Sequence, residues 1–170
     1  MEYIIIVMDI FAHALWTYAL FRIFNKKKYA ISGAIFGVLP DLVAFIPFFF
    51  YMLINNIHFQ RDASIFPHYT LIAYNITHSF IIFLVSFIVV YLILRKIALP
   101  MLGWGLHILI DIPSHTADFF PTPFLWPISN LTISGISWAD KYFMIFNYSL
   151  IILVYSYISL IKERNFKSKK

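Results

Sequence analysis

A histidine and an aspartate four residues apart are the strongest chemical signal in this sequence. They are His107 and Asp111, in the stretch Gly-Trp-Gly-Leu-His-Ile-Leu-Ile-Asp that begins at Gly103. Residues at positions i and i+4 of a helix lie on one face, so this imidazole and this carboxylate can converge on a single ion. Asp9 and His13 repeat the spacing in reverse order. Both pairs therefore predict helix faces that can bind a metal.

Three further ionisable side chains belong to the same pattern. Asp41 ends a Leu-Pro-Asp sequence, His78 is the centre of a Thr-His-Ser sequence, and His115 follows Pro113 by two residues. Pro113 is expected to end its helix, which would let His115 bend back over the site. An aspartate at the centre of a membrane-spanning helix costs about 2.5–3.5 kcal/mol, so such residues mark functional sites. A divalent cation neutralises carboxylates and is bound by carboxylates and imidazoles alike, which favours a metal site.

The composition places these residues in a membrane protein. Of the 170 residues, 61% are hydrophobic and 12% are charged, whereas soluble domains average about 25% charged residues. A spanning helix needs about 20 mainly apolar residues, and five segments are predicted to form one: 3–24, 29–54, 71–94, 98–112 and 142–161. We therefore expect an all-α, polytopic helix bundle that forms a single integral membrane domain over residues 1–170.

The positions of lysine and arginine predict the orientation of this bundle. With five crossings, eleven of these residues lie on one side, in two connections and in the basic tail 162–170. Only Arg61 and Lys141 lie on the other side. Because positive charges stay inside, we expect the N-terminus and the loop 113–141 outside and the C-terminus in the cytoplasm. The formal charge of +5 then reflects topology and contact with the anionic lipid bilayer, and no nucleic acid partner is expected.

The candidate ligands also share a depth in the predicted bundle. Counting about 1.5 Å per residue from the helix ends places them roughly 9 to 16 Å below the outer edge of the membrane. They are Asp9, His13, Asp41, His78, His107 and Asp111. Scattered structural polar residues need not agree in depth, so the agreement predicts a metal site in the outer half of the bundle. His58 and His68, in the outer connection, are interpreted as solvated or interfacial.

The order of these motifs resembles that of the membrane-bound metal-dependent hydrolases of the YdjM-like type. In that family an early-helix histidine, Leu-Pro-Asp, Thr-His-Ser and a later His-x-x-x-Asp recur in sequence, and here they match His13, Asp41, His78 and the pair His107 and Asp111 with their neighbours. The last motif and its following Ser-His are also similar to a segment of zinc-dependent phospholipase C. Where the family often has His-Arg-Gly ahead of Thr-His-Ser, this chain has Ala-Tyr-Asn at 73–75.

The resemblance implies a membrane-embedded hydrolase in which a metal-activated water attacks a phosphoester or an ester. The expected cofactor is a divalent metal, namely one or two zinc ions. The expected ligands are His13, Asp41, His78, His107 and Asp111, with Asp9 as a bridging or orienting carboxylate and His115 as a ligand or the general acid. The depth of the site suggests a lipid or lipid-linked substrate. We expect a prokaryotic cell (inner) membrane, with the site in its extracytoplasmic half.

Three other functions fit parts of the pattern. Ion or proton transfer uses intramembrane Asp and His residues, although no inverted repeat of the kind many transporters carry is visible. A haem protein would use paired histidines, whereas the carboxylates favour a harder ion. A non-catalytic assembly protein would use the buried polar groups only to specify helix pairing.

The uncharged stretch 119–129 is interpreted as a lid, a lipid-facing shelf or an ordered loop. The absence of cysteine excludes thiolate sites.

Overall fold

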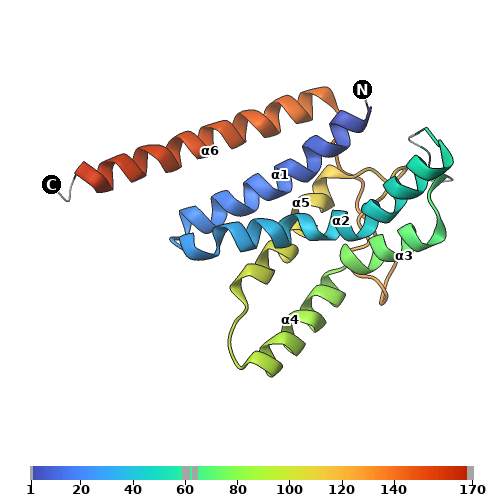
Figure 1. Cartoon of the computed structure of the whole chain (residues 1–170), viewed down its shortest axis with the longest axis horizontal. Helices are drawn as coiled ribbons and strands as arrows, with labels where there is room; N and C mark the ends of the chain where they lie inside the picture. Colours follow the sequence, from blue (N-terminus) through green and yellow to red (C-terminus); the bar gives the residue numbers. More distant parts are fainter. Residues whose placement is uncertain (1, 59–61, 63–64, 168–170) are drawn as a thin grey trace.

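The computed structural model describes residues 2–58, 62 and 65–167, and every regular element in this part of the chain is helical (Figure 1). The α-helices are α1 (Glu2–Ile23), α2 (Ala30–Asn55), α3 (His68–Thr77), α4 (Phe80–Leu94), α5 (Leu102–Ser114) and α6 (Lys141–Lys167), with short 3-10 turns η1 (Lys27–Tyr29) and η3 (Leu99–Met101). Helices α1, α3 and α5 all pack against α2, whereas α6 lies along α1 and α4 projects from the body. The prediction of an all-α fold is confirmed.

The two faces of α2 explain its central place. Its buried face carries small and polar residues, namely Gly33, Gly37, Pro40, Asp41 and Ala44. Its opposite face carries large apolar residues with exposed fractions of 40–71%, namely Ile31, Ile35, Leu39 and Val43. A helix of a soluble protein has the reverse distribution. Small residues facing other helices and apolar residues facing outward are what a helix in contact with lipid requires.

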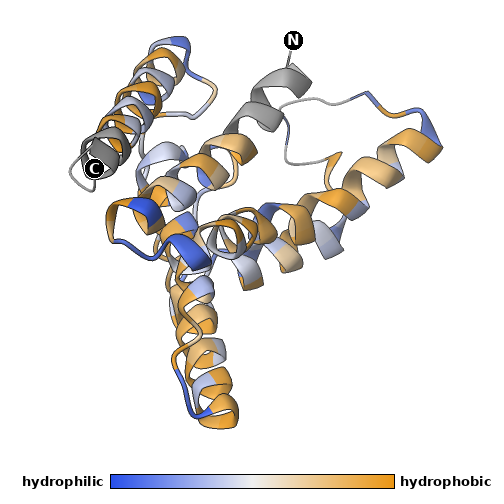
Figure 2. Cartoon of the chain, turned by 60° about the vertical axis from the view of Figure 1, so that its left-hand side comes forward, coloured by the Kyte–Doolittle hydropathy of each residue, from blue (hydrophilic) through white to orange (hydrophobic). Residues whose placement is uncertain are grey.

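Within the part of the chain that the structure describes, two helices are long and apolar enough to cross a membrane, Lys27–Asn55 and Lys141–Leu160. Helices α3 and α4 would make a third span if the bent pair is counted as one. Figure 2 shows hydrophobic residues along most of the helices, with hydrophilic ones gathered at several of the connections. These features are consistent with a membrane protein. Helix length supports two or three of the five spans that the sequence predicted. Of the other two segments, the 13 residues of α5 extend only about 20 Å against a hydrocarbon core of about 30 Å, and the described side chains of α1 cover only Ile10–Ile23.

The segment 71–94, predicted as one helix, is instead two helices that meet at His78 and Ser79 with a bend of 62°. Ser79 Oγ accepts hydrogen bonds from the backbone N–H groups two and three residues further on, at 3.1 and 3.3 Å, and so caps α4. The Ser79 hydroxyl also donates to the carbonyl oxygen of Trp126 in the loop after α5. Serine side chains give the backbone an alternative to the helical hydrogen bond. The break therefore depends on a partner that lies far away in the sequence.

We expect Ser79→Ala to lower the free energy of unfolding by about 1 kcal/mol, since loss of an N-cap side chain costs about 0.5–2 kcal/mol. The matched control is Ser86→Ala in the middle of α4, where no cap is lost. Thermal unfolding of both variants in detergent checks the prediction. Equal melting temperatures would show that the cap does not stabilise the break.

Helix α5 extends past Pro113, although the sequence predicted that this proline would end the helix at residue 112. The N–H of His115 donates to the carbonyl oxygen of Asp111 at 3.1 Å, and the Ser114 hydroxyl donates to a carbonyl one turn earlier at 2.9 Å. These bonds close the last turn although Pro113 has no N–H to donate. His115 therefore follows the helix directly and stays beside Asp111, as the predicted return of its side chain to the site requires.

A buried aromatic cluster attaches the loop 115–140 to the helices. Its members are Ala44, Phe48, Met52, Phe66, Tyr74, Phe119, Phe120 and Trp138. The N–H groups of Gly135 and Trp138 donate to the carbonyl oxygens of His115 and Ser114, both at 2.7 Å. The loop is thus held against α2, α3 and the end of α5. The role of residues 119–129 as a lid stays a prediction.

Candidate metal centre

Six of the seven predicted site residues meet in one buried cluster. They are His13 of α1, Asp41 of α2, His78 at the α3–α4 junction, His107 and Asp111 of α5, and His115 directly after α5. Their exposed fractions are 0–1%, except for 7% at Asp41 and His115. The seventh residue, Asp9, lies in the part of α1 whose side chains are outside the described residues, so its role stays a prediction.

Glycines bring α2 and α5 close enough for the cluster to form. A Cβ atom on Gly103 would collide with the backbone carbonyl oxygen of Gly33. One turn further along α5, His107 Nδ1 lies 2.8 Å from the carbonyl oxygen of Gly37. Small residues at a helix interface let the two backbones approach in this way. The imidazole of one helix can therefore bond directly to the backbone of the other.

Backbone and hydroxyl acceptors fix the tautomers of the two central histidines. His107 Nδ1–H donates to Gly37 O, as described above. His78 Nδ1 lies 3.0 Å from the carbonyl oxygen of Tyr74 and 2.9 Å from Thr77 Oγ1. Because the Thr77 hydroxyl donates its own hydrogen to a carbonyl one turn earlier, at 2.8 Å, its oxygen accepts from His78. In each neutral ring the Nε2 atom then carries the lone pair, which is the form that binds metals.

These two Nε2 atoms lie close to one another and to two carboxylates. The distance between His78 Nε2 and His107 Nε2 is 3.0 Å, which two unprotonated nitrogen atoms tolerate only when they share a proton or bind one metal ion. Asp111 Oδ2 is 3.1 Å from His107 Nε2 and 3.3 Å from His78 Nε2. Asp41 Oδ1 is 3.4 Å from His78 Nε2 and 3.7 Å from His107 Nε2. Four ligand atoms thus surround one small volume.

The spacing of three of these atoms suits a divalent ion with tetrahedral coordination, since His78 Nε2, His107 Nε2 and Asp111 Oδ2 lie 3.0 to 3.3 Å apart. With metal–ligand bonds of about 2.0–2.1 Å, as for zinc, tetrahedral ligand atoms lie about 3.3–3.4 Å apart. Asp41 Oδ1 lies 3.4 and 3.7 Å from the same two nitrogen atoms. The two carboxylates also balance the charge of a divalent cation when the imidazoles are neutral, so the buried site carries no net charge. The His/Asp cluster could therefore hold a metal ion.

Asp111 connects this group to the remaining two histidines. Its Oδ1 atom lies 3.0 Å from His13 Nε2 and 3.8 Å from His115 Nδ1. The rings of His13 and His107 lie 4.0 Å apart between centroids. The ligand atoms of His13, Asp41 and His107 form a second group, within 4.8 Å of one another, that could also hold an ion. The cluster thus offers two overlapping ion positions that share His107.

Tyr74 supports the centre, a role that the sequence did not reveal. Its ring stacks on the ring of His78 with 3.8 Å between centroids, and its hydroxyl donates to the carbonyl oxygen of Phe120 at 2.8 Å. Tyr74 precedes His78 by four residues, which on a helix places both on one face. That spacing is the signal that could have identified it.

No protein-family model, curated protein or solved structure matches this chain. The fold and the site themselves define the class. The chain is an all-helical protein with the features of a membrane protein, and it carries a buried His/Asp centre that could hold a metal ion.

Proposed function

We propose that this protein is a membrane-embedded metal-dependent hydrolase. The observation that carries the proposal is a pair of imidazole Nε2 atoms 3.0 Å apart, each 3.1–3.7 Å from two carboxylate oxygens, in a cluster whose residues are at most 7% exposed. Buried carboxylates are costly unless their charge is balanced. A divalent cation balances it and removes the repulsion between the two imidazoles.

The proposed ion is zinc, as one or two ions held by His78, His107, Asp41 and Asp111. His13 either completes the second ion position or holds the other oxygen of Asp111. When bound, the ion acts as a Lewis acid and activates a water. These side chains would bind and orient the ion and exclude bulk water from it.

His115 is the proposed general acid for the leaving group. With Asp41 it is one of the two cluster residues that reach the surface, each 7% exposed. Its Nδ1 lies 3.8 Å from Asp111 Oδ1 and 3.2 Å from the carbonyl oxygen of the same residue. The Asp111 backbone therefore orients the ring.

The proposed topology keeps five crossings, with the N-terminus outside and the C-terminus in the cytoplasm. It rests on the eleven-to-two distribution of lysine and arginine and on the apolar outer face of α2. In this topology the cluster lies in the outer, extracytoplasmic half of the membrane. A phosphoester or ester of a lipid or lipid-linked molecule is then the proposed substrate, since it reaches such a depth without leaving the bilayer.

Removal of the metal tests this function. We expect the purified protein to contain about one or two equivalents of zinc and to hydrolyse a chromogenic phosphodiester or ester in mixed micelles. A chelator should abolish turnover and lower the melting temperature, since a ligand present at 1,000 times its Kd stabilises a fold by about 4 kcal/mol. Added zinc should restore both. Absence of metal after reconstitution, or full turnover by the metal-free protein, would contradict the proposal, and ion flux in proteoliposomes without turnover would favour ion transfer instead.

A further inference from the structure

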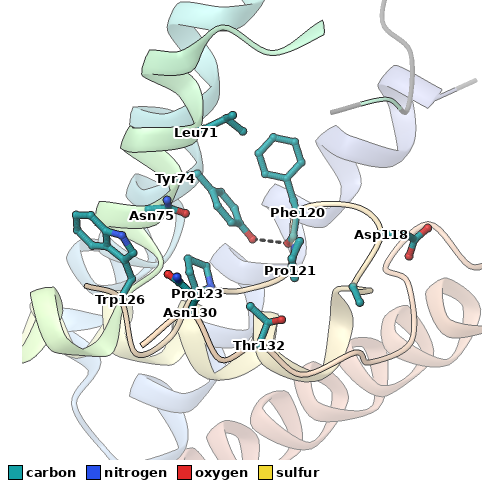
Figure 3. A pocket seen from close by; sticks show the side chains of 11 residues that line it. Leu71, Tyr74, Asn75, Asp118, Phe120, Pro121, Pro123, Trp126, Asn130 and Thr132 are labelled. Carbon is teal, nitrogen blue, oxygen red and sulfur yellow. Dashed lines mark hydrogen bonds between the residues drawn. The ribbon is translucent and has the colours of Figure 1, made fainter. Parts of the chain in front are cut away.

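A cavity of about 350 Å³ opens between α3 and the loop after α5 (Figure 3). Tyr74 and Asn75 contribute one side from α3, and Asp118, Trp126, Asn130 and Thr132 contribute polar groups from the loop. The volume lies at the lower end of the range of about 300–1,000 Å³ that is typical of small-molecule sites. It is large enough for one headgroup-sized molecule.

The cavity is a neighbour of the candidate metal centre. Tyr74 lines it and stacks on the ring of His78 with 3.8 Å between centroids. The Tyr74 hydroxyl is held by the carbonyl oxygen of Phe120 at 2.8 Å, the dashed line in Figure 3. A single aromatic ring thus stands between the cavity and the imidazole of His78. A molecule bound in the cavity would be held directly beside the centre.

The lining lacks the groups that bind anions. None of the lining residues is a lysine, arginine or histidine, and Asp118 is the one carboxylate among them. Phosphate and carboxylate groups are recognised by cationic side chains or by clusters of N–H donors. The chemistry of the lining therefore opposes an anionic headgroup.

Neutral groups that both donate and accept hydrogen bonds are present instead. The side chains of Asn75, Asn130 and Thr132 bond to no other side chain or backbone group in the part of the chain that the structure describes. Amides and hydroxyls match the hydroxyl groups of a sugar or polyol, which also donate and accept. The half-buried indole of Trp126 adds a flat apolar face with negative potential, against which the C–H face of a sugar ring can pack.

The loop that lines the cavity carries large apolar residues between its polar ones. Leu131, between Asn130 and Thr132, is 57% exposed, and Ile128 and Ile133 are 76% and 48% exposed. This segment is not helical, and successive side chains of an extended chain point to opposite sides. Exposed apolar side chains beside spanning helices are suited to the edge of the bilayer. In the proposed topology, such side chains place the mouth of the cavity at the edge of the bilayer.

We infer that this cavity binds the uncharged, hydroxyl-rich headgroup of a glycolipid. As an assignment of the substrate class this rests on the proposed function, in which the metal centre takes the scissile ester and the cavity takes the headgroup. The binding itself needs no metal. It can therefore be measured separately.

The test uses the full chain in phosphatidylcholine nanodiscs that contain equal small amounts of glucosyl diacylglycerol and phosphatidic acid with the same acyl chains. Native mass spectrometry then counts the lipids that the released protein retains. We expect the glucosyl lipid to be retained about tenfold over phosphatidic acid, and Asn75→Leu/Asn130→Leu to remove this preference, since two hydrogen-bonding groups are lost. Asn55→Leu is the matched control, because this exposed amide at the end of α2 is outside the lining.

Thr132→Val, which keeps the shape of the side chain, is expected to reduce the preference about threefold and keeps the test valid if the double variant unfolds. Equal retention of phosphatidic acid, or an unchanged preference in both variants, would overturn the inference. Competition by soluble methyl glucoside as strong as that by the glucosyl lipid would overturn the assignment to a lipid. Zinc content of the same samples separates the two proposals, because a protein that retains the glucosyl lipid without binding zinc would support the cavity and contradict the hydrolase.

Discussion

Alanine in place of His107 is expected to remove the bound metal and to reduce turnover at least about 100-fold. Its Nε2 atom lies 3.0 to 3.7 Å from ligand atoms of His78, Asp111 and Asp41, and both overlapping ion positions include it. Changes to residues that only support a metal ligand already cost about 10–100-fold in affinity or activity. Loss of the shared ligand should therefore cost at least the upper end of that range, as elemental analysis and turnover would measure.

The matched control is His58→Ala, since His58 is exposed in the connection after α2. It should keep the zinc content and turnover of the unaltered protein. Asp111→Asn separates charge from shape, because the amide fills the same space but leaves the ion's charge unbalanced. We expect it to lose zinc while remaining folded. Retention of zinc by both His107→Ala and Asp111→Asn would show that the cluster is not a metal centre.

The second large effect is expected from Gly103→Ala, which should lower the free energy of unfolding by about 1–3 kcal/mol, the usual cost of overpacking. The new Cβ would meet the carbonyl oxygen of Gly33 and the backbone nitrogen of Gly37. Backbone atoms of α2 cannot rotate away, so α2 and α5 must separate. Separation would also stretch the hydrogen bond from His107 to Gly37, so the zinc content should fall together with the melting temperature.

Gly105→Ala on the same helix is the control. Its Cβ would approach the ring of Phe83 at 2.9 Å, a side chain that can rotate aside. Both substitutions gain helix propensity, by about 1 kcal/mol, so only the contact with the neighbour differs. We expect Gly105→Ala to stay close to the unaltered protein in melting temperature and zinc content. Equal effects of the two variants would show that the close approach of α2 and α5 does not support the site.

The class of fold and the six side chains of the buried cluster could be predicted from the sequence. An all-helical chain follows from long apolar segments, and the buried His and Asp residues were recognisable because ionisable groups are costly in apolar surroundings. The i and i+4 spacing of His107 and Asp111 placed them on one face, which the structure confirms with an Nε2–Oδ2 distance of 3.1 Å. These inferences depend on local spacing and on composition, and both can be read along the chain.

How the cluster is assembled depends on contacts between residues far apart in the sequence. The helix break beside His78 depends on a hydrogen bond to Trp126, 47 residues away, and the His107 tautomer on a carbonyl 70 residues earlier. The cavity beside Tyr74 exists because the loop after α5 folds back onto α3. Partners so distant in sequence leave no periodic trace, since their positions are set by how closely the helices pack. For this reason the sequence could name the candidate ligands, whereas the packing alone determined which atoms face one another.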